Sequence, residues 1–306
     1  MKKIVIAGGT GFLGKMLSVH LANGNYEVVI LSRRVRKSVD NISHVKWDGE
    51  TLADWANELE GAYALINLCG KSVDCRYTES NKRQIYDTRL KSTRILGKAI
   101  EACENPPKVW MNSSSATIYR HAEDRDMDEE TGEIGTGFSV DVCQKWENTF
   151  FESTTPDTRK VALRIAIVLG KDGGALQPLK SLTKIGFGGR QGSGAQYFSW
   201  IHEADFVNIV SYILEKDELT GVYNVSSPNP VKNTQFMSAI RKSLKIPFGI
   251  PMPKWMLEIG ALIIRTETEL ILKSRRVVPK KLMENGYKFQ FSNLENAMSN
   301  LVQKEA

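Results

Sequence analysis

The sequence KKIVIAGGTGFLGKMLSVHLANG, residues 2–24, combines a short apolar run, a glycine-rich turn and a segment with leucines four apart. The apolar run predicts a β-strand over Lys3–Ala7, and the leucine spacing puts one apolar stripe on a helix over Phe12–Asn23. A strand followed directly by a glycine turn and a helix is the opening unit of a doubly wound α/β fold. This stretch therefore decides the class of the whole chain.

The turn has the spacing G-x-x-G-x-x-G, formed by Gly8, Gly11 and Gly14. In such a turn one glycine permits the tight bend, one lets the backbone approach a pyrophosphate, and one lets the helix pack closely on the strand. The N-terminus of the helix adds unpaired N–H donors and partial positive charge for the phosphates. The turn therefore predicts binding of a dinucleotide.

The end of the next strand, expected over Glu27–Leu31, indicates which dinucleotide is bound. NAD-binding proteins usually carry an acidic residue there, which accepts a hydrogen bond from the ribose 2′-hydroxyl. This chain has Ser32, Arg33 and Arg34 instead. Two guanidinium groups suit a 2′-phosphate, although the simplest alternative has one of them pointing to solvent. The sequence thus predicts a preference for NADP(H).

The first two-thirds of the chain alternates short β-branched runs with longer mixed segments, which is the pattern of a parallel sheet covered by helices. A long apolar stripe from about Asn81 to Cys103 predicts one of those helices. The predicted fold class is α/β, a Rossmann-like doubly wound parallel sheet with a smaller C-terminal substrate lobe. The further strands are expected over Val45–Trp47, Ala64–Leu68, Lys108–Ser113, Lys160–Leu169 and Leu219–Val225.

The chain changes character after the first two-thirds. Residues 185–198 hold five glycines and predict either a mobile loop or a pair of tight hairpin turns. A proline-rich segment, 247–253, precedes an amphipathic stretch over Lys254–Ser274 that is expected to form a helix.

These observations suggest two domains with a substrate cleft between them. We assign residues 1–226 to an NADP(H)-binding Rossmann-like domain with a loop insertion at about 171–203. Residues 227–306 form the smaller C-terminal substrate lobe in this interpretation.

The composition is that of an ordinary globular protein, with 306 residues, 42% of them hydrophobic and 25% charged, and a net charge of +6. The basic residues are scattered in pairs, so nucleic-acid binding is not expected. The four cysteines form no C-x-x-C pair and the four histidines lie far apart, so no metal site is predicted. Apolar runs are too short for a signal peptide or a membrane span, and we expect a cytoplasmic protein without membrane association.

Several motifs, taken in chain order, resemble a known family. The glycine turn, Asn67–Gly70 and Ser113–Tyr119 are similar to blocks of extended short-chain dehydrogenases/reductases of the nucleotide-sugar epimerase/dehydratase type. Leu163–Ile165, Ser199–His202 and Val278–Leu282 narrow the resemblance to an atypical epimerase group. Its members carry a C-terminal domain of unknown function, and some are described as sugar-nucleotide epimerases or cell-division inhibitors.

The resemblance implies a set of NADP(H)-binding residues. The backbone from Thr10 to Leu13 would contact the pyrophosphate, and the two arginines would bind the 2′-phosphate. Asp48 would receive the adenine amino group, and the residues from Leu68 to Gly70 would line the adenosine ribose. The full set is Gly8, Thr10, Gly11, Phe12, Leu13, Gly14, Arg33, Arg34, Asp48, Leu68, Cys69, Gly70 and Arg164.

The chain departs from the family where active members have Tyr-x-x-x-Lys on a helix. There the tyrosine is the acid/base, and the lysine lowers its pKa. If Glu147 matches the family's later helix glutamate, Ser139 takes the tyrosine position and Cys143 the lysine position. Lys145 is two residues further, about 200° around a helix, so we expect it to face away.

Three residues remain as candidate catalytic groups. Ser115 matches the family residue that hydrogen-bonds the substrate oxygen, and Tyr119 and His202 are possible substitutes for the missing acid/base. Tyr86 is a further phenol, while Tyr119 also matches a structural tyrosine of ordinary members. Asp205 matches a structural acid, which we expect to cap a helix N-terminus.

Two functions follow from these patterns. The first is an epimerase-like enzyme or oxidoreductase that exchanges hydride with NADP(H) and acts on a small molecule, either a nucleotide sugar or a carbonyl compound. The second is a regulatory protein, for example in cell division, in which the bound dinucleotide does not react. The resemblance also implies a homodimer through the helices around 81–103 and 139–152.

Overall fold

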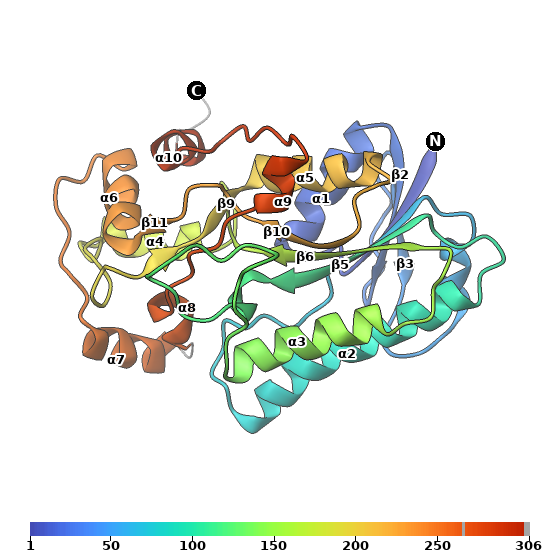
Figure 1. Ribbon diagram of the computed structural model, residues 1–306, viewed down its shortest axis with the longest axis horizontal. Helices are drawn as coiled ribbons and strands as arrows, with labels where there is room; N and C mark the ends of the chain where they lie inside the picture. The colour runs from blue at the N-terminus through green and yellow to red at the C-terminus, as the bar shows by residue number, and fades with distance from the viewer. Residues whose placement is uncertain (265–266, 303–306) are drawn as a thin grey trace.

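The computed structural model describes residues 1–264 and 267–302. Its centre is a seven-stranded parallel sheet in the order β10-β6-β5-β4-β1-β2-β3 (Figure 1), which is the Rossmann-like doubly wound arrangement predicted from the sequence. The strands are β1 (Lys2–Ala7), β2 (Tyr26–Ser32), β3 (Ile42–Lys46), β4 (Ala64–Asn67), β5 (Val109–Ser115), β6 (Arg159–Ile165) and β10 (Gly221–Val225).

Helices cover both faces of the sheet because successive strand residues point to opposite sides. Ile4 and Ile6 of β1 pack in one buried cluster with α1 (Phe12–Asn23) and α5 (Glu203–Glu215). Val5 and Ala7 pack in a second cluster, on the side of α2 (Glu79–Glu101) and α3 (Phe138–Phe151). Figure 1 shows α2 and α3 side by side on this second face. Two 3₁₀ turns, η1 (Asp54–Leu59) and η2 (Ala116–Ile118), complete this part.

The strand expected over Lys160–Leu169 is two strands, so that boundary prediction was wrong. The chain leaves the central sheet after Ile165, and β7 (Ile167–Leu169) pairs instead with β9 (Trp200–His202). The register pairs Leu169 with His202. This small sheet carries the chain from the large sheet toward the lobe at the other end of the molecule.

The smaller lobe has a core of its own, which includes Trp200, Phe236 and Met298. Trp200 lies in the inserted loop 171–203 and the other two follow residue 227, so this core draws on both segments, from which the smaller lobe is expected to form. Of the long helix expected over Lys254–Ser274, the described residues form two helices, while residues 265–266 lie outside the described part of the chain. The elements here are α4 (Leu176–Lys184), β8 (Tyr197–Phe198), β11 (Val231–Lys232), α6 (Asn233–Ser243), α7 (Lys254–Ile264), α8 (Glu269–Leu272), α9 (Lys280–Glu284) and α10 (Leu294–Val302).

The glycine-rich segment 185–198 runs beside the proline-rich segment 247–253. Backbone hydrogen bonds join Gly189 N to Ile250 O at 3.1 Å and Gly192 N to Met252 O at 2.8 Å. A Cβ on Gly189 would lie 2.5 Å from the backbone of Ile250, so glycine permits this close approach. The glycines therefore allow the backbones of two segments that are distant in sequence to form hydrogen bonds side by side.

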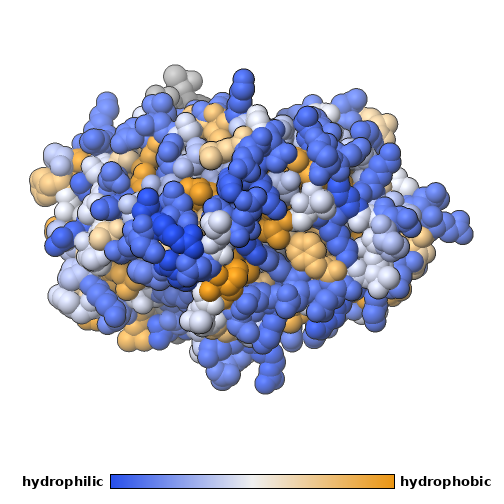
Figure 2. Space-filling model, viewed as in Figure 1, coloured by the Kyte–Doolittle hydropathy of each residue, from blue (hydrophilic) through white to orange (hydrophobic). Residues whose placement is uncertain are grey.

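The face seen in Figure 2 is mostly hydrophilic, with apolar side chains in small groups between the polar ones. Within the described residues, no helix has both the length and the apolar character required to cross a bilayer.

Candidate functional site

Two adjoining cavities lie at the carboxyl ends of the strands, where ligands of doubly wound folds bind. The outer cavity has a volume of about 530 Å³ and is lined by Gly8, Thr10, Arg33 and Asp48 among others. The inner cavity, of about 260 Å³, is lined among others by Ser115, Ser139 and Cys143. The segment Leu68–Gly70 lines both cavities, so a long ligand can extend from one into the other.

The glycine turn forms the floor of the outer cavity. Gly8 has a φ of 78°, which favours glycine, and a Cβ on Gly14 would lie 2.4 Å from the Cα of Gly9. In the described chain no side chain caps the N-terminus of α1 at Gly11. The first N–H groups of that helix are therefore available to an anionic ligand.

Phe12 and Leu13 follow the turn with different surroundings. The ring of Phe12 packs against Gly173 and Gly174, where an added Cβ would lie 2.4 Å and 3.0 Å from ring atoms. Leu13 lines the inner cavity. Phe12 can therefore contribute only its backbone to phosphate binding, while its ring fixes the loop after β7.

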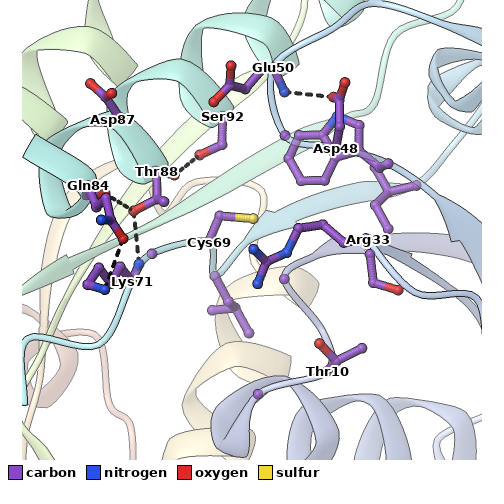
Figure 3. A pocket seen from close by; sticks show the side chains of 18 of the residues that line it. Thr10, Arg33, Asp48, Glu50, Cys69, Lys71, Gln84, Asp87, Thr88 and Ser92 are labelled. Carbon is purple, nitrogen blue, oxygen red and sulfur yellow. Dashed lines mark hydrogen bonds between the residues drawn. The ribbon is translucent and has the colours of Figure 1, made fainter. Parts of the chain in front are cut away.

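The two arginines after β2 lie in different environments. Arg33 lines the outer cavity, and Figure 3 shows its guanidinium pointing into the cavity toward Cys69. Both side chains are exposed, but Arg34 does not line either cavity; its carbonyl accepts a hydrogen bond from the Ser32 hydroxyl at 2.8 Å. One guanidinium of the pair thus faces the cavity.

Asp48 lies on the wall of the outer cavity opposite the glycine turn. Its Oδ1 accepts hydrogen bonds from the backbone N–H groups of Glu50 at 2.8 Å and Thr51 at 2.9 Å. These bonds, that of Glu50 first, lower the pKa of Asp48. The carboxylate therefore stays ionised at the cavity wall.

Ser139 and Cys143 line the inner cavity one helical turn apart on α3, together with Ser115 of β5. Burial raises the pKa of the Cys143 thiol to about 12, so the group is neutral at physiological pH. Lys145 lies outside this cavity and forms an ion pair with Asp141 at 2.7 Å. No charge from α3 therefore replaces the family's lysine at Cys143.

Tyr119, expected as a catalytic candidate, does not line either cavity. It is 1% exposed, donates a hydrogen bond to Asn224 Oδ1 at 2.9 Å and accepts one from Arg164 Nη1 at 2.9 Å. Arg164, expected as a cofactor ligand, is itself held by Glu147 and does not line a cavity. Both side chains belong to a buried polar network behind the inner cavity.

His202 is also buried away from the cavities. Its Nδ1 accepts a hydrogen bond from Ala204 N at 3.0 Å, and its Nε2 lies 3.1 Å from Asn300 Oδ1. His202 therefore caps α5, which makes the expected capping role of Asp205 wrong. The carboxylate of Asp205 instead accepts hydrogen bonds from the backbone N–H groups of Gln290 and Phe291, each at 2.8 Å.

Tyr77 and Arg89 are among the residues lining the inner cavity that sequence reasoning missed. Arg89 donates to the carbonyl oxygens of Lys71 at 3.0 Å and Ile85 at 3.1 Å, and burial lowers its pKa. Tyr86, the other phenol considered, donates instead to Asp141. The described residues contain no group of three or more His, Cys, Asp or Glu side chains suited to a metal ion.

Comparison with known proteins agrees with this geometry. Residues 4–139 match the NAD dependent epimerase/dehydratase family, and residues 252–301 match a domain of unknown function. The chain is 33% identical over 305 residues to the epimerase family protein YfhF of Bacillus subtilis, covering 98% of this chain and 97% of that protein. The chain belongs to the epimerase family.

Two human comparisons extend this assignment. This epimerase family protein is 29% identical to human epimerase family protein SDR39U1 over 98% of its own length and 99% of the human protein. The crystal structure of human SDR39U1 (isoform2) with NADPH matches with a TM-score of 0.87 and 28% identity, covering 98% of this chain and 99% of that one. The described fold is thus that of NAD(P)-binding epimerases.

Proposed function

We propose that this epimerase family protein binds NADP(H) across the two cavities and exchanges hydride with a small carbonyl compound, alcohol or nucleotide sugar. The observation that carries the proposal is Arg33, which faces the outer cavity at the end of β2, where an NAD-specific protein would have an acid. The relative SDR39U1, solved with NADPH, supports the same cofactor.

The residues present fit the dinucleotide. The uncapped N-terminus of α1 and the Cβ-free surface of Gly14 suit the diphosphate, and Arg33 suits the 2′-phosphate. Asp48 would accept the adenine amino group, and Leu68–Gly70 would contact the adenosine ribose. A bound dinucleotide would supply or receive a hydride at its nicotinamide end, in the inner cavity.

The inner cavity has hydroxyl groups for the reacting part of the ligands. Ser113 Oγ is buried and finds no hydrogen-bond partner among the described residues, so a ligand group would satisfy it. Among the described residues Ser115 Oγ accepts a hydrogen bond from Thr117 N at 3.3 Å, and its own proton can bond a substrate oxygen. These hydroxyls would orient a carbonyl or alcohol by hydrogen bonds.

A regulatory function is the second candidate, because the usual acid/base pair is absent. Ser139 has an aliphatic hydroxyl that does not titrate usefully, and Cys143 is neutral at physiological pH. In this alternative the bound dinucleotide holds the two lobes in one arrangement that a protein partner recognises.

Titration of the purified protein with NADPH and with NADH at equal ionic strength tests the cofactor proposal. We expect NADPH to bind more tightly; equal or tighter binding of NADH would overturn it. Absorbance of the NADPH-loaded protein at 340 nm, followed with panels of carbonyl compounds and nucleotide sugars, then separates the two functions. Tight NADPH binding without oxidation by any member of the panels favours the regulatory one.

A further inference from the structure

A chain of three polar side chains begins in the inner cavity and ends on the smaller lobe. Tyr77 Oη lies 3.4 Å from Ser139 Oγ, and Ser139 Oγ donates a hydrogen bond to Glu269 Oε2 at 3.0 Å. Tyr77 and Ser139 both line the inner cavity. Glu269 is the first residue of α8, nearly 200 residues after Tyr77.

The direction of these hydrogen bonds follows from the carboxylate. An ionised carboxylate only accepts, so the proton of Ser139 points to Glu269 and the serine oxygen is left to accept from Tyr77. Each hydroxyl therefore donates toward Glu269. The 3.4 Å separation is long for a hydroxyl pair, and catalytic hydrogen bonds commonly tighten when ligands bind.

Packing and a backbone hydrogen bond hold Tyr77 in one position at the inner cavity. Its ring meets Phe138 edge to face with centroids 4.7 Å apart, and its backbone N–H donates to Glu267 Oε1 at 2.8 Å. Glu267 also lies 3.5 Å from the guanidinium of Arg76. Two glutamates of the smaller lobe thus position the phenol and the serine of the Rossmann-like domain.

Charges of both signs surround the phenol. Burial raises the pKa of Tyr77, and the negative charges of Glu269, Cys75 and Glu267 raise it further. Burial also lowers the pKa of Lys273. The titratable groups that interact electrostatically with Tyr77 or Glu269 across the packed elements are Cys75, Arg89, Glu267, Lys273 and Arg275. The phenol is protonated at neutral pH and needs a relay to exchange its proton.

We propose that Tyr77 is the acid/base of this protein, with Ser139 and Glu269 as its proton relay, in place of the family's Tyr-x-x-x-Lys pair. The proposal rests on the hydride exchange proposed above. In alcohol oxidation the substrate O–H proton passes to Tyr77, the Tyr77 proton to Ser139, and the Ser139 proton to the Glu269 carboxylate, while the C–H hydride leaves to NADP⁺. Carbonyl reduction by NADPH reverses each transfer, so that protonated Glu269 supplies the proton of the new hydroxyl.

The alternative interpretation is that the Ser139–Glu269 hydrogen bond is purely structural and attaches the smaller lobe to α3. A measurement without substrate separates the two interpretations. With 3-fluorotyrosine at position 77, ¹⁹F NMR reports the pKa of that phenol in the full-length protein. We expect Glu269→Gln to lower this pKa by removing the charge at the end of the relay, and Ser139→Ala to reduce that effect.

Glu267→Gln is the matched control, because Glu267 bonds the Tyr77 backbone and lies outside the relay. The proposal is overturned if Glu269→Gln shifts the phenol pKa no more than Glu267→Gln does, or shifts it equally with and without Ser139. Circular dichroism of each variant confirms folding before the comparison.

Turnover gives the second arm, with 4-nitrobenzaldehyde as the carbonyl probe and NADPH as the reductant. We expect Tyr77→Phe to reduce the rate about 10²- to 10⁴-fold with an unchanged Kd for NADPH. Glu269→Gln should change the pH profile of the rate, which a fastening role alone would not do. Absence of NADPH binding in the wild type contradicts the proposed function, whereas a fully active Tyr77→Phe contradicts the relay. If the wild type binds NADPH without reducing the probe, the NMR comparison alone determines whether the relay exists.

Discussion

Arg164 and Glu147 form a two-point ion pair in the interior, with Nε 2.9 Å from Oε1 and Nη2 2.8 Å from Oε2. Ser114, one of the residues that line the inner cavity, donates its hydroxyl to the same carboxylate at 2.5 Å. Burial alone would lower the pKa of Arg164, but the hydrogen bonds and charge of Glu147 outweigh it and raise that pKa. The pair supports the cavity wall from behind.

Replacing Glu147 should therefore be strongly destabilising. Glu147→Ala leaves a buried, unpaired guanidinium, and we expect a loss of about 3–5 kcal/mol in the free energy of unfolding. Urea denaturation measures it, with Glu152→Ala, an exposed glutamate at the end of the same helix, as the control. A loss at Glu147 no larger than at Glu152 would contradict the assigned role.

Arg33 should determine the cofactor preference. Removing one charge-assisted hydrogen bond costs about 1.5–3 kcal/mol, so Arg33→Ala should weaken NADPH binding about 10- to 100-fold and leave NADH binding nearly unchanged. Arg34→Ala is the control, because Arg34 does not line the outer cavity. Fluorescence titration checks both variants; a larger effect at Arg34 would move the phosphate contact to that residue.

Gly14 should tolerate no side chain. In Gly14→Ala the new Cβ would lie 2.4 Å from the Cα of Gly9, and backbone atoms cannot yield cheaply, so we expect loss of NADPH binding and a lower melting temperature. Gly260→Ala on α7 is the matched control, since nothing lies within 4 Å of its Cβ. Alanine there should be neutral or stabilise the helix by up to about 1 kcal/mol.

His202 should make the stability depend on pH. Burial lowers its pKa from 6.5, so between 6.5 and its lower folded value the unfolded chain binds more protons than the folded one. The stability it contributes is present above pH 6.5 and is lost as the pH falls through the folded value. His202→Asn keeps a capping oxygen but does not titrate, so its melting temperature should fall less than that of the wild type as the pH is lowered below 6.5.

Tyr119→Phe tests whether the buried phenol is structural. The change removes the partner of Arg164 Nη1 and of Asn224 Oδ1, so we expect a loss of about 1–3 kcal/mol in stability. The Kd for NADPH should not change. Abolished NADPH oxidation in a fully stable variant would instead support the catalytic role first considered for Tyr119.

The sequence predicted the parts of the site that depend on neighbouring residues. The glycine turn, the strand before it and the helix after it are contiguous, so their spacing predicted both the fold and a Cβ-free turn at the N-terminus of α1. Arg33 follows directly from its position at the end of the second strand. Arg34 was also predicted to bind the phosphate, but it does not line the cavity. The residue type alone does not determine the direction in which an exposed side chain points.

The remaining parts of the site depend on contacts between distant segments. Tyr77 and Glu269 approach each other only after α8 has packed beside the loop that precedes α2, and no local pattern marks either residue. Tyr119 and His202 have residue types suited to catalysis, but Tyr119, directly after η2, and His202, at the end of β9, are both buried. Their burial comes from tertiary packing, which a single sequence does not reveal.

Strand β10 has a consequence for synthesis of the chain. It pairs with β6 at one margin of the large sheet, but the two strands are separated along the chain by β7, α4, β8, β9 and α5. A nascent polypeptide emerging from the ribosome would therefore present β6 as an open edge until the stretch 221–225 is translated. Unpaired N–H and C=O groups on such an edge invite association with other chains, so slow translation of this interval would expose the protein to aggregation.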